Sequence, residues 1–411
     1  MEKDARRMAE LAARTSYGRL LAILSSGSRD ISAAEDALSE ALVAALKTWP
    51  ERGVPDNPDA WLLTTARNRQ RNSSRHSKVR DAAAEEIERR YEELSQARKD
   101  FPDERLKMLF VCAHPAIDEA IRTPLMLQIV LGLDAQRIGS AFLVSPTAMG
   151  QRLVRAKTKI RDSGLRFAIP DPEALSDRLA DVLNAIYAAF GTAWDDLPGA
   201  AEGEQGLAEE AIYLARLIMT LLPDEPEPKG LLALMLYCHA RKDARRDEAG
   251  RFVPLTEQDS AKWSSDMIVE AEQLLTEASR AATFGRFQCE AAIQSVHAQR
   301  AFTGTTNHAA LLTLYDLLVA QCPTVGNVVS RAAMLLEAGQ AETAREALET
   351  LPAAKTTQYQ PYWVTTAFVA TAIGDGQTAA KAFETAIALT EDPAVRAFLA
   401  EKAAHISGSA G

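Results

Sequence analysis

The sequence has few cysteines and lacks long apolar runs. Its four cysteines, Cys112, Cys238, Cys289 and Cys322, lie far apart without a C-x-x-C pair, which argues against a disulfide framework and against a zinc ribbon. Cys112 and His114 are near enough in sequence to share a metal, but no second pair lies nearby, so we assign both to packing. No apolar run reaches the roughly 18 residues of a membrane span, and the N-terminal residues lack the apolar core of a signal peptide. We therefore expect a cytoplasmic protein with no membrane partner.

Strand-forming patterns are also scarce. Alternating runs of β-branched residues are nearly absent, whereas Ala, Leu, Glu and Arg recur at helical spacing, so the sequence predicts an all-α fold. Prolines, glycines and charge runs divide the chain. The predicted parts are a first helical domain, a charged linker, a second helical domain and a long helical extension, at residues 1–80, 81–103, 104–167 and 168–411.

Charge is distributed unevenly between the two halves. The whole chain has a net charge of −10, yet residues 1–167 hold 28 Lys and Arg against 23 Asp and Glu, while residues 168–411 hold 18 against 33. A basic first part suits a polyanion such as nucleic acid. The acidic extension indicates a different role, and its helical, repeat-like composition suits an interaction surface.

A weak repeat lies near the C-terminus. The pattern Ala338-Gly339, Ala344, Leu348 returns 35 residues later as Ile373-Gly374, Ala379, Phe383. This period is close to the roughly 34 residues of tetratricopeptide repeats. Tetratricopeptide-like repeats and ordinary helical hairpins both remain open from two copies.

The first domain is predicted to contain an acidic helix. Ser32 and Glu35 have the spacing of a capping box that opens a helix reaching about Trp49. Asp36 and Glu40, four residues apart, lie on its exposed face, where a solvated acidic face is the favoured interpretation from spacing alone. The expected inward stripe comprises Ala34, Leu38, Ala41, Ala45 and Leu46.

A second helix begins at Asn57-Pro58, an N-cap followed by proline in the first turn. Its first half is apolar and includes Trp61, which could offer a stacking surface. Residues 67–80 then carry six Lys and Arg without an acid, interleaved with amides and hydroxyls. Such a run either binds phosphates and bases or is a solvated face.

The second domain contains the more specific pattern, a helix-turn-helix. Residues 134–142 predict a short helix, Leu143-Val144 a tight turn, and Ser145-Pro146 the capped start of a second helix. Met149, Leu153, Ala156 and Ile160 form its predicted buried stripe. Opposite this stripe we expect Gln151, Arg152, Arg155, Lys157, Lys159 and Arg161. A capped helix with basic and amide residues outward suits a DNA major groove.

Together these motifs resemble regions two and four of extracytoplasmic-function (ECF) sigma factors of the sigma-70 family. The resemblance implies that Asp36 and Glu40 of the segment 34–41 bind core RNA polymerase, and that the two helical domains bind promoter DNA at its −10 single strand and −35 duplex. For the −10 element it implicates Trp61, Arg67, Asn68, Arg71, Asn72, Arg75 and Lys78. For the −35 element it implicates Thr147, Gln151, Arg152, Arg155, Lys157 and Lys159.

The resemblance extends along nearly the whole chain. Residues 110–116, 151–157, 230–236 and 291–293 resemble the subgroup that carries a C-terminal tetratricopeptide-like extension. From its acidic, repeat-like composition, our hypothesis is that the extension regulates the first half of the chain and offers a site for a regulatory protein or ligand. Residues 168–411 show no catalytic constellation, because His239, His297 and His308 lack partners at ligand or triad spacing. We therefore expect no enzymatic activity and no cofactor. A helix-turn-helix regulator acting without core polymerase, or a helical scaffold, are the alternatives.

Overall fold

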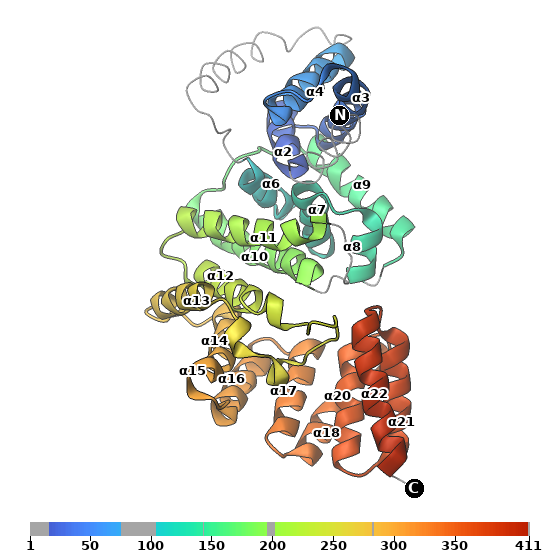
Figure 1. Cartoon of the computed structure of the whole chain (residues 1–411). Helices are drawn as coiled ribbons and strands as arrows, with labels where there is room; N and C mark the ends of the chain where they lie inside the picture. The colour runs from blue at the N-terminus through green and yellow to red at the C-terminus, as the bar shows by residue number, and fades with distance from the viewer. Residues whose placement is uncertain (1–15, 75–103, 143, 195–201, 282, 410–411) are drawn as a thin grey trace. The chain divides into compact units, whose positions relative to one another are not determined.

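The chain folds into helices and loops. The computed structural model describes residues 16–74, 104–142, 144–194, 202–281 and 283–409. Within these residues the backbone holds only helices and one isolated bridge between Arg246 and Phe252 (Figure 1), which confirms the predicted all-α fold. Two compact units are present: unit 1 comprises residues 1–194 and 201–214, and unit 2 comprises residues 195–200 and 215–411.

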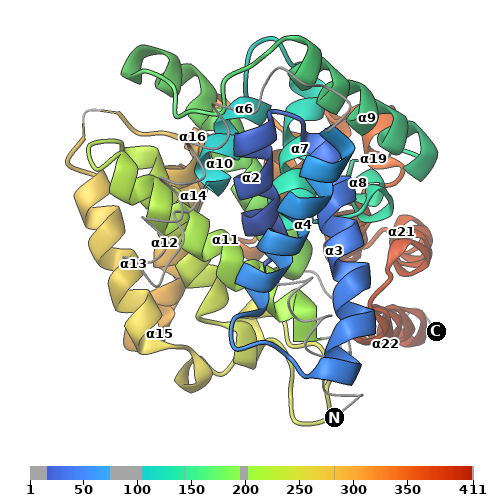
Figure 2. The same cartoon turned by 90° about the horizontal axis from the view of Figure 1, so that it is seen from above.

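Unit 1 spans the residues of the two predicted helical domains, 1–80 and 104–167. The first is built from α2, α3 and α4, and Figure 2 shows α3 and α4 packed side by side. The second is built from α6 to α9, with α10 and the start of α11 packed within the same unit. The helices are α2 (Tyr17–Ser28), α3 (Ile31–Arg52), α4 (Pro58–Ser74), α6 (Arg105–Cys112), α7 (Glu119–Leu131), α8 (Ala135–Ala141), α9 (Pro146–Asp162), α10 (Pro172–Trp194) and α11 (Glu202–Leu221).

Helix α2 of the first helical domain packs tightly against α7 of the second. The leucines of α2 are buried, and at Gly18 the helices approach so closely that a Cβ would overlap the carbonyl oxygen of Val130. Gly132 ends α7 with a left-handed φ of 69°, beside the ring of Tyr17. Since only glycine lacks the Cβ that would collide, Gly18 permits this approach.

Residues beyond 167 complete the core of unit 1. Helix α10 packs against α6 and α7, where Arg122 of α7 binds Asp181 of α10 at 2.7 Å. Arg178 of α10 also donates a hydrogen bond to the Phe110 carbonyl at 3.4 Å. The structure thus groups α10 with the second helical domain, although the sequence places it in the extension.

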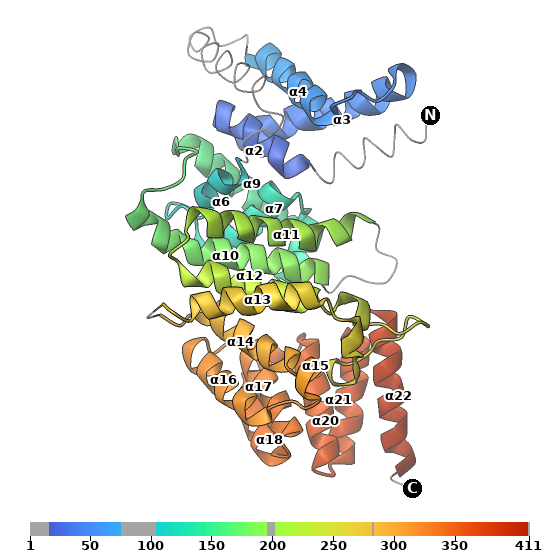
Figure 3. The same cartoon turned by 60° about the vertical axis from the view of Figure 1, so that its left-hand side comes forward.

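Unit 2 is a series of helices that follow one another from α12 to α22 (Figure 3). Helix α12 is buried along nearly its whole length because α13 and α14 pack against it. The helices are α12 (Pro226–His239), α13 (Ser265–Ala278), α14 (Arg286–Ala298), α15 (Arg300–Thr303), α16 (His308–Gln321), α17 (Val325–Glu337), α18 (Ala341–Glu349), α19 (Ala353–Thr356), α20 (Gln360–Ala372), α21 (Gly376–Leu389) and α22 (Pro393–Ser409).

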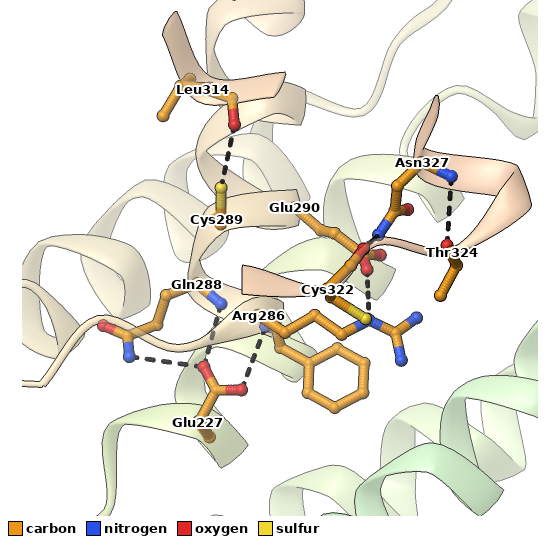
Figure 4. Close-up of polar contacts among 10 residues, drawn as sticks. Glu227, Arg286, Gln288, Cys289, Glu290, Leu314, Cys322, Thr324 and Asn327 are labelled. Atoms are coloured by element: carbon orange, nitrogen blue, oxygen red, sulfur yellow. Dashed lines mark hydrogen bonds and ion pairs between the residues drawn. The ribbon is translucent and has the colours of Figure 1, made fainter. Parts of the chain in front are cut away.

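A carboxylate joins α12 to the start of α14. Glu227 accepts hydrogen bonds from the backbone N–H groups of Phe287 and Gln288 at 3.0 and 3.1 Å (Figure 4). These donors have no partner inside α14, so the carboxylate caps the helix from a distant part of the sequence. At Gly230 a Cβ would lie 2.7 Å from the Gln288 nitrogen, so α12 and α14 touch through their backbones.

The repeat noticed in the sequence corresponds to two helical hairpins with matching geometry. Gly339 between α17 and α18 and Gly374 between α20 and α21 have φ angles of 77° and 82°. The repeated positions after each turn are buried, namely Ala344 and Leu348 in the first hairpin and Ala379 and Phe383 in the second. Small and large residues at equivalent positions therefore pack the two hairpins in the same way.

A loop of unit 2, residues 240–264, connects α12 to α13 and contacts α22 and the residues before it. It contains three short 3₁₀ turns, and its Arg246 forms an ion pair with Asp392 before α22. The Phe252 ring packs edge-on against Phe398 of α22 at 5.6 Å.

Among the described residues, no helix is long and apolar enough to cross a membrane.

Candidate nucleic-acid interface

Helix α9 forms as the sequence predicts. The Ser145 hydroxyl accepts a hydrogen bond from the Ala148 N–H at 3.4 Å, and proline occupies the first turn. This arrangement satisfies one of the free N–H groups at the helix start. The predicted inward stripe is buried, at Met149, Leu153, Ala156 and Ile160.

A tight turn fixes α9 relative to α8. The Val144 N–H donates to the Gly139 carbonyl at 2.8 Å, and a Cβ at Gly139 would lie 2.6 Å from the Val144 carbonyl oxygen. Glycine is therefore required in α8 for the turn to close. The short α8, the turn and the capped α9 together have the arrangement of a helix-turn-helix.

One face of α9 is open to solvent and rich in donors. Thr147, Gln151, Arg152, Arg155 and Lys159 are all exposed. The Arg155 side chain is held along the helix, because its Nε donates to the Gln151 carbonyl at 3.3 Å. Amides and guanidinium groups on such a face can contact base edges, and ammonium groups can contact phosphates.

Lys157 departs from this pattern. Its side chain is 8% exposed, and its Nζ donates to the Glu35 carboxylate of α3 at 2.6 Å. The expectation that Lys157 points outward with its neighbours is therefore wrong. The reason is tertiary, because α3 packs against this part of α9 and provides a carboxylate. A phosphate contact by Lys157 would require this pair to break.

Helix α3 presents the acidic face that the sequence predicts. Asp36 and Glu40 are both exposed, and Glu40 lies 3.4 Å from the guanidinium of Arg69 on α4. Burial, together with the carboxylates of Glu35 and Asp36, raises the pKa of Tyr17 well above its usual range. Negative charge is thus concentrated along this side of α3.

Two details of α3 differ from the expectation. Its N-cap is Asp30, whose carboxylate accepts from the Ala33 N–H at 3.1 Å, so the capping box from Ser32 is wrong. Asp30 lies two residues before Ser32, and its carboxylate satisfies one of the free N–H groups at the helix start. Leu46 is 43% exposed, while the other four residues of the predicted stripe are buried.

Helix α4 carries five of the seven residues predicted to contact the −10 element, namely Trp61, Arg67, Asn68, Arg71 and Asn72. Asn57 caps it as predicted, accepting from the Ala60 N–H at 3.0 Å. Asn68 and Arg71 are exposed and Arg67 is half-buried. The side chain of Asn72, and all of Arg75 and Lys78, lie outside the described residues. The roles of all seven residues at the −10 element remain predictions.

Trp61 stands at the apolar start of α4. Its ring meets that of Trp49 edge-on, with centroids 5.5 Å apart, and Trp49 is 1% exposed. Trp61 itself is half-buried, and the buried Trp49 ring packs against it. Edge-on pairs of this kind hold an aromatic ring in a fixed orientation.

Several structural contacts carry no signal in the sequence. Arg19 of α2 pairs with Asp59 at the start of α4, and Ser26 of α2 donates to Glu104, next to α6, at 3.2 Å. These pairs join residues far apart in the chain, so neither periodicity nor spacing could have indicated them. They fix α2 between the two helical domains of unit 1.

The described residues hold no cluster of three or more His, Cys, Asp and Glu that could bind a metal. Cys112 is fully buried, and burial raises the pKa of its thiol. The His114 side chain stabilises the local turn, because its Nδ1 accepts a hydrogen bond from the Ala116 N–H at 3.1 Å. Both residues therefore have local packing roles.

Comparison with known proteins places these helices in families. Residues 13–79 match sigma-70 region 2, which covers α2, α3 and α4. Residues 178–279 match a family of unknown function, DUF6596. No solved structure matches the chain.

An uncharacterized protein of Rhizobium meliloti (strain 1021) is 34% identical over 387 residues, which cover 92% of this chain and 91% of that protein. The similarity therefore includes both units. The chain belongs to the same family as this Rhizobium meliloti protein, and its sigma-70 region 2 domain supports its assignment as a sigma-70 family sigma factor.

Proposed function

We propose that the protein is an ECF-type sigma factor that directs core RNA polymerase to specific promoters. The observation that carries this proposal is that unit 1 combines a sigma-70 region 2 match with an exposed, donor-rich helix α9 in helix-turn-helix geometry. Region 2 provides the link to the polymerase, and α9 provides the link to duplex DNA.

In this proposal each surface has one task. The acidic face of α3, with Asp36 and Glu40, binds core polymerase. The exposed part of α4 and the basic residues after it capture the −10 single strand. The exposed face of α9 reads the −35 duplex, with Gln151 and Arg152 on base edges and Lys159 on a phosphate. Unstacking the −10 bases costs a few kcal/mol per step, which these contacts offset.

We further propose that unit 2 is a tetratricopeptide-like regulatory module. The matched hairpins of α17–α18 and α20–α21 support the repeat, and the acidic composition of residues 168–411 supports a role in protein or ligand binding. The module acts on the first half of the chain, either by masking its basic surfaces or by stabilising its complex with polymerase.

The test of the main proposal is reconstitution of transcription. The full-length protein is mixed with bacterial core polymerase, and complex formation and promoter-specific transcripts are measured. Asp36→Arg is expected to weaken the core complex at least tenfold, because it reverses charge on the proposed contact. The control Ser39→Ala changes a neighbouring exposed residue of α3 and should leave the complex unchanged.

The outcome separates the alternatives. Absence of any core complex would contradict the sigma-factor proposal. A footprint on duplex DNA formed without core polymerase would instead favour a helix-turn-helix regulator.

The role of unit 2 is tested by truncation after Pro223 rather than near residue 168. Truncation near residue 168 would remove α10, whose Asp181 pairs with Arg122 of α7 within unit 1. It would therefore damage the half of the chain that is proposed to bind DNA. Masking by unit 2 predicts more promoter-specific transcript from the truncated protein than from the full chain. A stabilising role predicts less.

A further inference from the structure

Helix α9 contains two residues that packing does not explain. Val154 is 58% exposed, although a valine side chain gains free energy when it is buried. Gly150 lies in the helix interior, where glycine is less favourable than alanine by about 1 kcal/mol. They are four positions apart in the sequence (i and i+4), so they are neighbours along one ridge of the helix surface.

The backbone does not require glycine at position 150. Its φ is not among the positive angles of the chain, and a Cβ built there would meet only the Ala135 Cβ at 4.0 Å, an ordinary contact. Gly139 in the same helix-turn-helix is different, because its Cβ would collide with the turn at 2.6 Å. The turn therefore explains why position 139 is glycine, whereas no contact within the described residues explains glycine at position 150.

The positions of Gly150 and Val154 on α9 suggest why these two residues occur there. Val154 lies one turn after Gln151 and next to Arg155, on the exposed face of α9 that is turned away from the buried stripe. Helical side chains lean toward the N-terminus, so Val154 leans over the turn that contains Gly150. With no side chain at Gly150, the methyl groups of Val154 are uncovered and the helix is locally thinner.

These features match the chemistry of a major groove. The groove is about 12 Å wide and an α-helix with its side chains is 10–12 Å across, so a missing side chain permits closer approach. The thymine C5-methyl is the apolar group that base pairs present there. The cationic groups of Arg152, Arg155 and Lys159 on the same exposed surface complement the phosphates on either side.

We infer that Val154, exposed by Gly150, contacts the C5-methyl group of a thymine in the −35 element and makes that base a specificity determinant. This inference rests on the proposed function, in which α9 reads the −35 duplex. It adds an apolar contact to the polar readers Gln151 and Arg152, and it names the base that the contact selects.

The test removes methyl groups from each partner in turn. The full-length protein with core polymerase selects binding sites from a duplex pool randomised in place of the −35 element. Each thymine in the selected sequence is then replaced singly by deoxyuridine, which lacks only the methyl group. Binding is measured for the wild-type chain, for Val154→Ala, and for Val269→Ala, a control valine of similar exposure (52%) on α13.

At one thymine, deoxyuridine is expected to weaken wild-type binding threefold to tenfold. Val154→Ala should show a similar loss on the thymine duplex and no further loss with deoxyuridine, whereas Val269→Ala should behave as wild type. Gly150→Ala should bind the selected site more weakly while its unfolding midpoint rises, because alanine favours the helix.

Two results would overturn the inference. One is wild-type binding that no deoxyuridine substitution changes, and the other is a Val154→Ala variant that remains as sensitive to deoxyuridine as the wild type. Failure to select any sequence is a separate result, because it would contradict the proposed −35 recognition as a whole.

Discussion

Lys157 of α9 and Glu35 of α3 form an ion pair of 2.6 Å between the two helical domains of unit 1, and their side chains are only 8% and 18% exposed. The pair joins the helix proposed to read the −35 element to the helix proposed to bind polymerase. Such a nearly buried pair fixes the position of both helices, since loss of one partner leaves the other charge without compensation.

Replacing Lys157 with methionine should therefore destabilise unit 1. We expect a loss of about 1–3 kcal/mol, because the Glu35 carboxylate keeps only partial access to water. Denaturant unfolding measures the effect. Lys159→Met is the matched control, as Lys159 is exposed on the same helix, and equal stability of the two variants would show that the pair is unimportant.

Gly18 provides a test of the contact between α2 and α7. Gly18→Ala places a Cβ against the Val130 carbonyl and should destabilise the protein by several kcal/mol, since two backbones must separate. Gly27→Ala in the same helix meets nothing within 4 Å and should be neutral or slightly stabilising. If both variants unfold at the wild-type denaturant concentration, the two helical domains do not pack in this way in solution.

His297 should make unit 2 sensitive to acid. Burial and the nearby charges of Arg241, Arg300 and His308 lower its pKa to about 4. The unfolded chain, with a histidine pKa near 6.5, then binds more protons between these values, so stability falls as pH decreases through this window. We expect a loss of about 1 kcal/mol between pH 7.5 and pH 5.5. Urea unfolding at the two pH values should show this loss for the wild type and a smaller one for His297→Gln.

Two of the four cysteines should resist alkylation. Cys112 and Cys289 are buried, and burial raises the pKa of both thiols, to about 11 for Cys289. The reactive thiolate is therefore scarce at pH 8. Mass spectrometry after a short iodoacetamide pulse should find label first on the partly exposed Cys322. Early label on Cys112 would contradict the packing of α6.

Two exposed residues of α9 should differ in their effect on DNA binding if α9 reads the −35 element. Gln151→Ala should relax the preference at one base pair, with a loss of discrimination of about 1–3 kcal/mol. Lys159→Ala should weaken binding to every sequence alike and reduce the salt slope of log K by about 1. Affinities at several salt concentrations, for the selected and scrambled duplexes, distinguish the two effects. Identical behaviour of both variants would argue against separate base and phosphate roles.

Local order in this protein follows from its sequence. The caps at Asn57 and Ser145 and the buried stripe of α9 form as predicted, because each depends on residues within a few positions of one another. The repeated turns at Gly339 and Gly374 are likewise visible from spacing alone. The all-α fold and the exposure of Asp36 and Glu40 could likewise be predicted from local sequence patterns.

Only the tertiary structure decided which elements meet. Lys157 turns inward because Glu35, far away in sequence, supplies a carboxylate, and α10 joins unit 1 because Asp181 meets Arg122. Periodicity identifies the face of a helix that is buried, but it does not identify the partner that covers it or the residues at the edge of that face. Those contacts depend on the packing of distant helices, which is a property of the folded chain as a whole.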